Sequence, residues 1–282
     1  MRRYYIRQLF GRSQFWRSLL FSVLFSLIFS GFAYAIANQV NLAQLPQLHD
    51  RLAQQQLLEE FATAKPHPMP PQLSVWRSPD PEDYFDQIQP VSVGYLVWSE
   101  FPVKVYVEPS QTFEQANDFL KRRADAWVAA VQTAVQEWAD YLPLELVPSP
   151  EAADITIWRK VPPLQFETDE QGKIRPARAR SAETRFELYR KASPPRLAHR
   201  FSIWLRPDQA QGYFLAAARH ELGHALGIWG HSPLQTDALY FSQVRTPPPI
   251  SARDVNTLKR VYEQPTRLGW AQMGDRVSVT SY

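Results

Sequence analysis

The chain has 282 residues, of which 45% are hydrophobic and 21% charged, so most of it is expected to fold as one substantial domain with appendages. It contains no cysteine, which excludes a disulfide framework, a thiolate metal site and a cysteine nucleophile. Residues 1–37 carry five arginines and no acidic residue. The rest of the chain has the other 26 of the 31 basic side chains against 28 acidic ones. The chain after residue 37 therefore has no excess of positive charge for binding nucleic acid. The five are Arg2, Arg3, Arg7, Arg12 and Arg17.

Residues 19–37, LLFSVLFSLIFSGFAYAIA, form an uncharged apolar run after these arginines. As a helix this run is ~28 Å long, close to the ~30 Å hydrocarbon core of a bilayer. The basic segment 1–18 predicts a cytoplasmic N-terminus and an exported body, with the membrane as a partner through residues 19–37. Ala33-Tyr34-Ala35 also fits a cleavage site, so a signal sequence that releases a secreted body is the alternative.

Residues 38–90 are expected to form a helical stalk followed by a Pro-rich linker. Four leucines recur near helical spacing before KPHPMPPQ at 65–72 interrupts the pattern. The leucines are Leu45, Leu48, Leu52 and Leu58. The main folded domain is therefore expected to span 91–282.

Strand and helix patterns follow one another in this domain as in an α+β fold. Alternating apolar residues predict a strand at 104–107, and residues 113–141 predict a long helix with Phe119 on its apolar face. Four more strands, another helix and a last helix that begins at a capping box of Ser251 and Asp254 complete the order. The strands are expected at 144–147, 153–160, 180–191 and 198–207, and the first of the two helices from about residue 213.

One twisted mixed sheet backed by two long helices is therefore expected. We expect an edge strand within 198–206, just before the second long helix. His199 in this strand is expected to be a surface residue.

The stretch HELGHALGIWGHS, residues 220–232, holds three of the six histidines. His220 and His224 are four residues apart, so on a helix both imidazoles lie on one face and can bind one metal ion. Zn²⁺ suits neutral imidazoles, and Glu221 lies beside them, where it can activate water. Gly227 can end the helix in a left-handed conformation and turn the chain back toward the metal, which brings His231 close.

HELGHALG at 220–227 resembles the metzincin zinc peptidases, and with the following His-Ser it is most similar to the bacterial-type matrixin branch. The family pattern His-Glu-x-x-His-x-x-Gly-x-x-His puts its last position on Gly230, which has no side chain. His231 is therefore interpreted as the third ligand, after a spacer one residue longer than the family's. Asp237 is the competing ligand, since carboxylate oxygen also binds zinc.

The metzincins also carry a methionine in a turn below the metal, and Asp237-Ala238-Leu239-Tyr240 stands in its place here. Leu239 is expected to replace the methionine as the apolar floor, with Tyr240 next to it in the turn.

The resemblance implies a zincin-like domain at 91–282 that hydrolyses peptide bonds, with Zn²⁺ bound by His220, His224 and His231 and with Glu221 as general base. The substrate is then a peptide or protein, and its specificity pocket is expected between the helix and residues 239–250. The alternative is a non-catalytic, zinc-bearing peptide-binding or scaffold protein at the membrane.

Overall fold

The computed structural model describes residues 63–110, 117–163, 166–168, 174–176 and 180–271. The basic segment 1–18, the apolar run 19–37 and the leucine-patterned residues 41–62 lie outside the described residues. Within the described part of the chain, no helix has the length and apolar character needed to cross a membrane.

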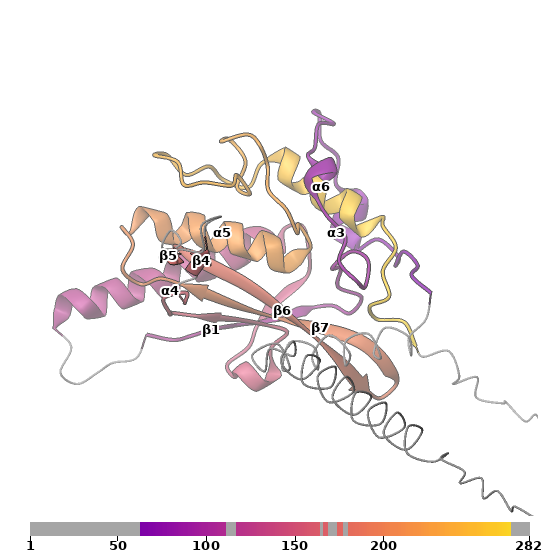
Figure 1. Cartoon of the computed structure of the whole chain (residues 1–282), viewed down its shortest axis with the longest axis horizontal. Coiled ribbons are helices and arrows are strands. Elements are labelled where there is room, and N and C mark those ends of the chain that lie inside the picture. The colour runs from indigo at the N-terminus through magenta and orange to yellow at the C-terminus, as the bar shows by residue number, and fades with distance from the viewer. Residues whose placement is uncertain (1–62, 111–116, 164–165, 169–173, 177–179, 272–282) are drawn as a thin grey trace, which may run out of the picture. The chain divides into compact units, whose positions relative to one another are not determined.

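The core of the fold is a five-stranded mixed sheet in the order β2-β1-β3-β7-β6 (Figure 1). Strands β2 (Leu144–Leu146), β1 (Val103–Val107), β3 (Ile155–Trp158) and β7 (Pro195–Leu205) run parallel to one another. Strand β6 (Ala182–Ala192) pairs antiparallel with β7 along eleven residues. Two short strands, β4 (Phe166–Thr168) and β5 (Ile174–Pro176), form a separate antiparallel pair.

The edge strand beside the second long helix is β6, not the 198–206 segment. Residues 198–205 belong to β7, which pairs with β3 on one side and with β6 on the other. The expectation was wrong because β6, residues 182–192, pairs with the side of β7 that faces away from β3. The free main-chain groups at this end of the sheet therefore belong to β6.

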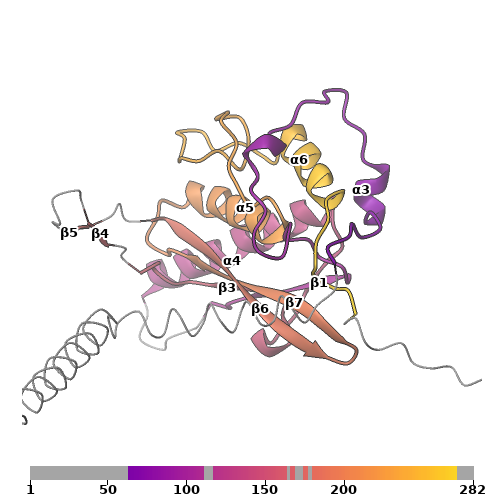
Figure 2. The ribbon, with the colours of Figure 1, turned by 45° about the vertical axis from the view of Figure 1, so that its right-hand side comes forward.

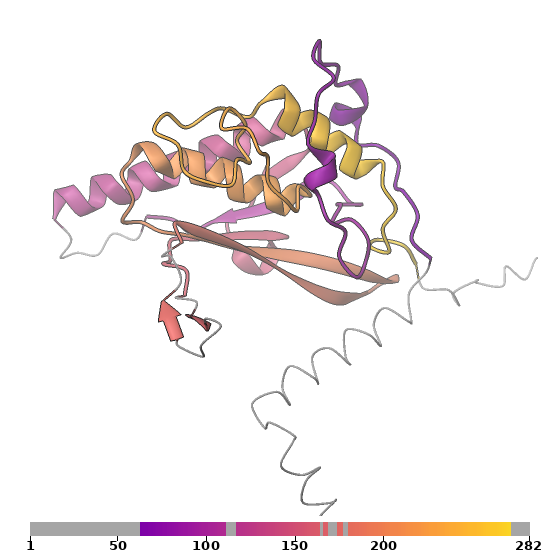
Figure 3. The same cartoon turned by 45° about the horizontal axis from the view of Figure 1, so that its top comes forward.

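Two long helices, α4 (Asp118–Ala139) and α5 (Gly212–Leu226), pack against each other and lie on the same face of the sheet (Figure 3). The Asn117 side chain caps α4 by accepting a hydrogen bond from the Leu120 amide. Its buried face is formed by Trp127, Val131, Ala134, Val135 and Trp138. Phe119 was expected on this face, but it is 61% exposed because the first turn of α4 extends beyond the sheet (Figure 1).

The described residues before Val91 pack with those that follow. They contribute Leu73, Tyr84 and Ile88 to the hydrophobic core. Their helix α3 (Pro71–Val75) lies beside α6 (Ala252–Tyr262), and η2 (Phe85–Gln87) also packs on α6 (Figure 2). The prolines fix an extended path and leave the apolar side chains between them free to be buried.

The N-terminus of α6 carries the capping box that the sequence predicts. Ser251 accepts a hydrogen bond from the Asp254 amide, and the Asp254 carboxylate accepts one from the Ser251 amide. The same carboxylate is fully buried and also accepts hydrogen bonds from the Tyr84 hydroxyl at 2.5 Å and from the Ala238 amide at 2.9 Å. The start of α6 is thereby tied to the 84–91 segment and to the turn at residues 237–240.

Candidate metal centre and its cleft

Helix α5 carries His220 and His224 one turn apart, and it ends at Gly227. Gly227 has a φ of +132°, a backbone conformation that side chains with a Cβ rarely adopt. A Cβ at this position would also lie 2.9 Å from the Leu96 carbonyl oxygen. The amide of Ile228 then bonds back to the Gly223 carbonyl, so the chain turns under the helix as the sequence predicts.

The imidazoles of His220 and His224 are each held by a carbonyl oxygen on the side away from their partner. The His220 Nδ1 lies 3.0 Å from the Ala238 oxygen, and the His224 Nδ1 lies 2.7 Å from the Ile228 oxygen. A carbonyl oxygen only accepts, so each Nδ1 is the donor of its hydrogen bond. The two Nε2 atoms face each other and are only 3.1 Å apart.

Two lone pairs at this separation repel each other unless a cation lies between them. Two nitrogen ligands at ordinary zinc–nitrogen distances and a tetrahedral angle are separated by ~3.3 Å. The observed 3.1 Å is close to that value. The two nitrogens are therefore close enough together that they could hold one metal ion.

His231 is the third member of this cluster of histidines. One nitrogen from each of the three histidines lies within 4.8 Å of the others, so His220, His224 and His231 could hold a metal ion. Burial, followed by the two neighbouring histidines, keeps the pKa of His224 well below its ordinary value. Burial and then His220 lower the pKa of His231 to about 4. Both rings are therefore neutral at pH 7, as metal ligands must be.

The longer spacer before His231 is accommodated by burial and close packing. Ile228 is fully buried, and the Trp229 ring packs edge-on against Phe186 with a centroid distance of 5.3 Å. Gly230 follows in tight contact with η2, since a Cβ there would lie 2.4 Å from the Gln87 carbonyl oxygen. Glycine is therefore required at this point for the chain to deliver His231 to the site.

Asp237, the competing ligand, lies outside this group and is engaged elsewhere. Its Oδ2 accepts hydrogen bonds from the Ser232 hydroxyl and from the Arg253 Nε, the latter at 3.1 Å. The carboxylate is almost fully buried and forms an ion pair with Arg253. The Asp237 Oδ2 is thus engaged by Ser232 and Arg253, although Asp237 lines the same cleft as the histidines.

Glu221 lies next to His220 on α5 and lines the same cleft. Its side chain is buried, and its Oε2 accepts a hydrogen bond of 2.6 Å from the Thr184 hydroxyl on β6. Desolvation raises the pKa of Glu221, while His220 and the Thr184 hydrogen bond oppose that shift. A buried carboxylate with a raised pKa is a stronger base than one in water. The sequence pattern contained no signal that linked Thr184 to this carboxylate.

The turn at 237–240 lies directly below the two helical histidines. Leu239 is fully buried and contacts α5 at Gly223, where an added Cβ would be 2.6 Å from the Leu239 Cδ2. The Ala238 carbonyl is the group that holds His220, and the Leu239 carbonyl accepts a hydrogen bond from the Ser232 amide at 2.8 Å. Leu239 therefore forms an apolar floor, while Tyr240 is half-buried and lines the cleft.

The histidines open into a cleft of about 940 Å³. Ala216 and Ala217 of α5 form part of one wall, residues 240–244 with Pro247 and Pro248 form another, and residues 180–184 at the start of β6 form a third. The cleft therefore includes part of the 239–250 segment in which the specificity pocket was expected. Its small and apolar lining beside α5 leaves room for a side chain of a bound molecule.

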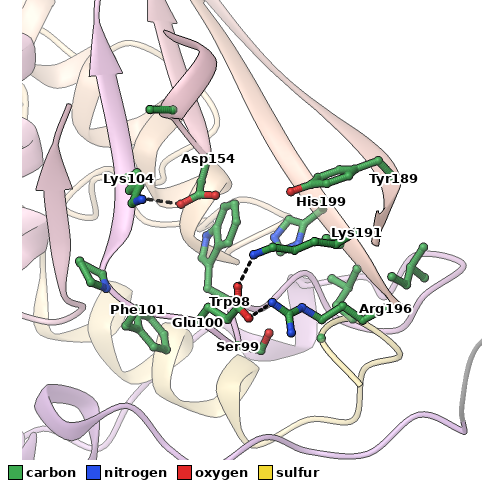
Figure 4. A pocket seen from close by; sticks show the side chains of 16 residues that line it. Trp98, Ser99, Glu100, Phe101, Lys104, Asp154, Tyr189, Lys191, Arg196 and His199 are labelled. Carbon is green, nitrogen blue, oxygen red and sulfur yellow. Dashed lines mark hydrogen bonds and ion pairs between the residues drawn. The ribbon is translucent and has the colours of Figure 1, made fainter. Parts of the chain in front are cut away.

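A second cavity of about 710 Å³ lies at the far end of the β6–β7 hairpin (Figure 4). Glu100 in this cavity forms ion pairs with Lys191 and Arg196. His199, expected at the surface, is only 3% exposed and stacks on the Trp98 ring with centroids 4.0 Å apart. Burial lowers the pKa of His199 to about 3, so this ring is a neutral core residue.

No protein-family model matches the chain, and no curated protein matches it either.

Proposed function

We propose that this chain is a zinc-dependent metalloendopeptidase of the metzincin type, similar to the matrixins, that cleaves peptide bonds within proteins. The observation that carries the proposal is the pair of Nε2 atoms of His220 and His224, which face each other at 3.1 Å with His231 beside them. Glu221 lies in the same cleft, so a metal site and a base are adjacent.

The donor set favours zinc. Three neutral imidazole nitrogens leave a fourth position of a tetrahedral ion open, which is typical of catalytic zinc sites. Carbonyl oxygens hold the outer nitrogens of His220 and His224, as the ligands of such sites require. When bound, zinc supplies a Lewis acid that polarises the carbonyl of the substrate and lowers the pKa of water.

Glu221 is proposed as the general base. Its carboxylate accepts a proton from the attacking water and then delivers that proton to the nitrogen of the leaving amine. Burial raises its pKa, which makes the carboxylate a stronger base toward the attacking water.

Substrate binding is proposed along β6, in a zincin-like arrangement of sheet, active-site helix α5 and second helix α4. Strand β6 is the edge of the sheet, and residues at its start line the cleft. An extended peptide can pair with the free main-chain groups of such an edge. This mode of binding suits cleavage within a flexible segment, away from the chain ends.

The decisive experiment compares wild type with Glu221→Gln in zinc content and in turnover of a mixed peptide library. Glutamine has nearly the same volume but cannot act as a base, so we expect full zinc content and a loss of turnover of ~10²–10⁴-fold. His220→Ala and His224→Ala should lose both zinc and turnover. A wild-type protein that binds zinc and peptides but cleaves none would instead be a non-catalytic peptide-binding protein, and the proposal would fail.

The location of this activity is proposed to be outside the cytoplasm, with the body anchored through residues 19–37 or released by cleavage after Ala35. Protease added to intact cells should then degrade the body, whereas protection until lysis would exclude this topology. The mass of the mature protein separates the anchored from the secreted form, because cleavage removes ~35 residues.

A further inference from the structure

The edge strand reaches the proposed base through one side chain. Thr184 is the third residue of β6, and its Oγ1 lies 2.6 Å from Glu221 Oε2 and 3.2 Å from the Glu221 main-chain oxygen. A threonine hydroxyl has a single proton to donate. The shorter contact and the charged acceptor both direct that proton to the carboxylate, where the hydrogen bond is stronger than one to a neutral carbonyl.

The backbone that carries the hydroxyl is fixed independently of Glu221. Thr184 lies opposite Ile203 in the β6–β7 ladder, on the same face of β6 as Phe186, which is partly buried and packs against the hydrophobic core. Its β-branched side chain has restricted rotation about χ1 in a strand. Glu221, in contrast, has three rotatable side-chain bonds and can leave a reactive geometry unless it is fixed.

We propose that Thr184 is a positioning residue for Glu221, which it holds by Oε2 so that Oε1 is the oxygen presented to the attacking water. This inference rests on the proposed function. It gives β6, the strand proposed to bind the substrate, the additional role of orienting the general base. Thr184 touches neither the metal ligands nor the substrate carbonyl in this role. It therefore acts on the reaction only through Glu221.

The test uses the full chain with Thr184→Val, which removes the hydroxyl but keeps the branched shape, and Thr184→Ser, which keeps the hydroxyl. Thr184→Val should lower kcat by about 10- to 100-fold, the range expected for a lost hydrogen bond to a charged group. Its zinc content should remain within twofold of wild type, because no ligand is removed. Its KM should change much less than its kcat, because main-chain pairing along β6 does not use the Thr184 hydroxyl. Thr184→Ser should retain most of the wild-type kcat.

The matched control is Thr156→Val on β3. Thr156 is likewise half-buried in the sheet, and its Oγ1 lies 3.3 Å from the Phe201 carbonyl and 3.1 Å from the Ser202 hydroxyl, but it has no contact with Glu221. Its valine variant should keep its kcat. A fall in kcat there equal to that of Thr184→Val would mean that loss of any strand hydroxyl slows the enzyme, and the inference would be overturned.

A readout independent of turnover is the position of the carboxylate in crystals of the metal-free proteins. One position within hydrogen-bond distance of residue 184 is expected in wild type and Thr184→Ser, and a displaced or multiple position in Thr184→Val. Thr184→Ala serves as the second hydroxyl-free variant if valine prevents folding. Active wild type with an equally active Thr184→Val, or with an inactive but folded Thr184→Ser, overturns the inference alone, whereas an inactive wild type overturns the proposed function as well.

Discussion

Leu239 and Gly223 pack so closely that a methyl group added to Gly223 would lie 2.6 Å from the Leu239 Cδ2. The same methyl group would lie 3.1 Å from the Trp138 ring on the other long helix. The turn below the histidines, α5 and α4 therefore meet at one glycine. The absence of a side chain at position 223 sets how closely the floor approaches the metal ligands.

Substitution of Leu239 tests its role as the floor. Leu239→Ala should lower the free energy of unfolding by about 2–5 kcal/mol, because a fully buried side chain is removed. Leu239→Met conserves volume and should cost less than about 1.5 kcal/mol. Denaturant unfolding measures both values, and zinc content should be unchanged in Leu239→Met. A methionine variant as unstable as the alanine variant would contradict this account of the turn.

Substitution of Gly223 has a matched control in the same helix. Gly223→Ala must displace Leu239 or Trp138, so it should destabilise the protein by about 1–3 kcal/mol despite the higher helix propensity of alanine. At Gly212, a Cβ would meet no atom within 4 Å, so Gly212→Ala should leave stability equal or slightly higher. Thermal unfolding of the two variants in parallel measures the difference. Equal melting temperatures would show that the contact at Gly223 relaxes without cost.

A metal-binding measurement distinguishes His231 from Asp237 as the third ligand. His231→Ala should weaken zinc binding strongly and abolish hydrolysis, because one of three ligands is lost. Asp237→Asn should keep zinc and turnover, since the Asp237 carboxylate is directed to Arg253 and Ser232. Zinc content after dialysis against a competing chelator gives the comparison, and circular dichroism verifies folding. Retention of zinc in His231→Ala with its loss in a folded Asp237→Asn would reverse the assignment.

The burial of His199 predicts a pH dependence of stability. Its pKa is about 3 in the folded chain and 6.5 in the ordinary state, so the unfolded chain binds more protons between these values. Stability is therefore present above pH 6.5 and is lost as the pH falls, by about 2 kcal/mol at pH 5. His199→Phe keeps a ring beside Trp98 but cannot titrate. Denaturant unfolding at pH 7.5 and pH 5 should give a smaller loss for the variant, and an equal loss would exclude His199 as the cause.

Much of the site could be predicted because its determinants are local. The i, i+4 spacing of His220 and His224 and the helix-ending Gly227 act within a few residues, and the capping box at Ser251 does so too. The alternation of side chains along β7 also predicts the burial of His199, because His199 lies on the same face of the strand as the buried Phe201 and Ile203.

The remaining features depend on pairing between distant parts of the chain. Periodicity alone does not say which of two consecutive strands is the outer one, so the edge was assigned to β7 when it is β6. The Thr184–Glu221 contact joins residues 37 positions apart, and Tyr84 meets Asp254 across 170 positions. No local pattern encodes such contacts, since they follow from how the sheet and helices pack.

The Asp254 carboxylate has a further consequence for cooperativity. It accepts hydrogen bonds from Ser251 at the start of α6 and from Ala238 in the turn that holds His220, so opening of the turn removes one partner of the carboxylate that caps the helix. In native-state hydrogen exchange, the Ala238 amide and the first turn of α6 should therefore open together as one unit. A chain that ends before Ser251 would retain all three candidate metal ligands yet lose the buried carboxylate that bonds to the turn beside His220. Helix α6 thus supports the candidate metal site, although it contributes no ligand to it.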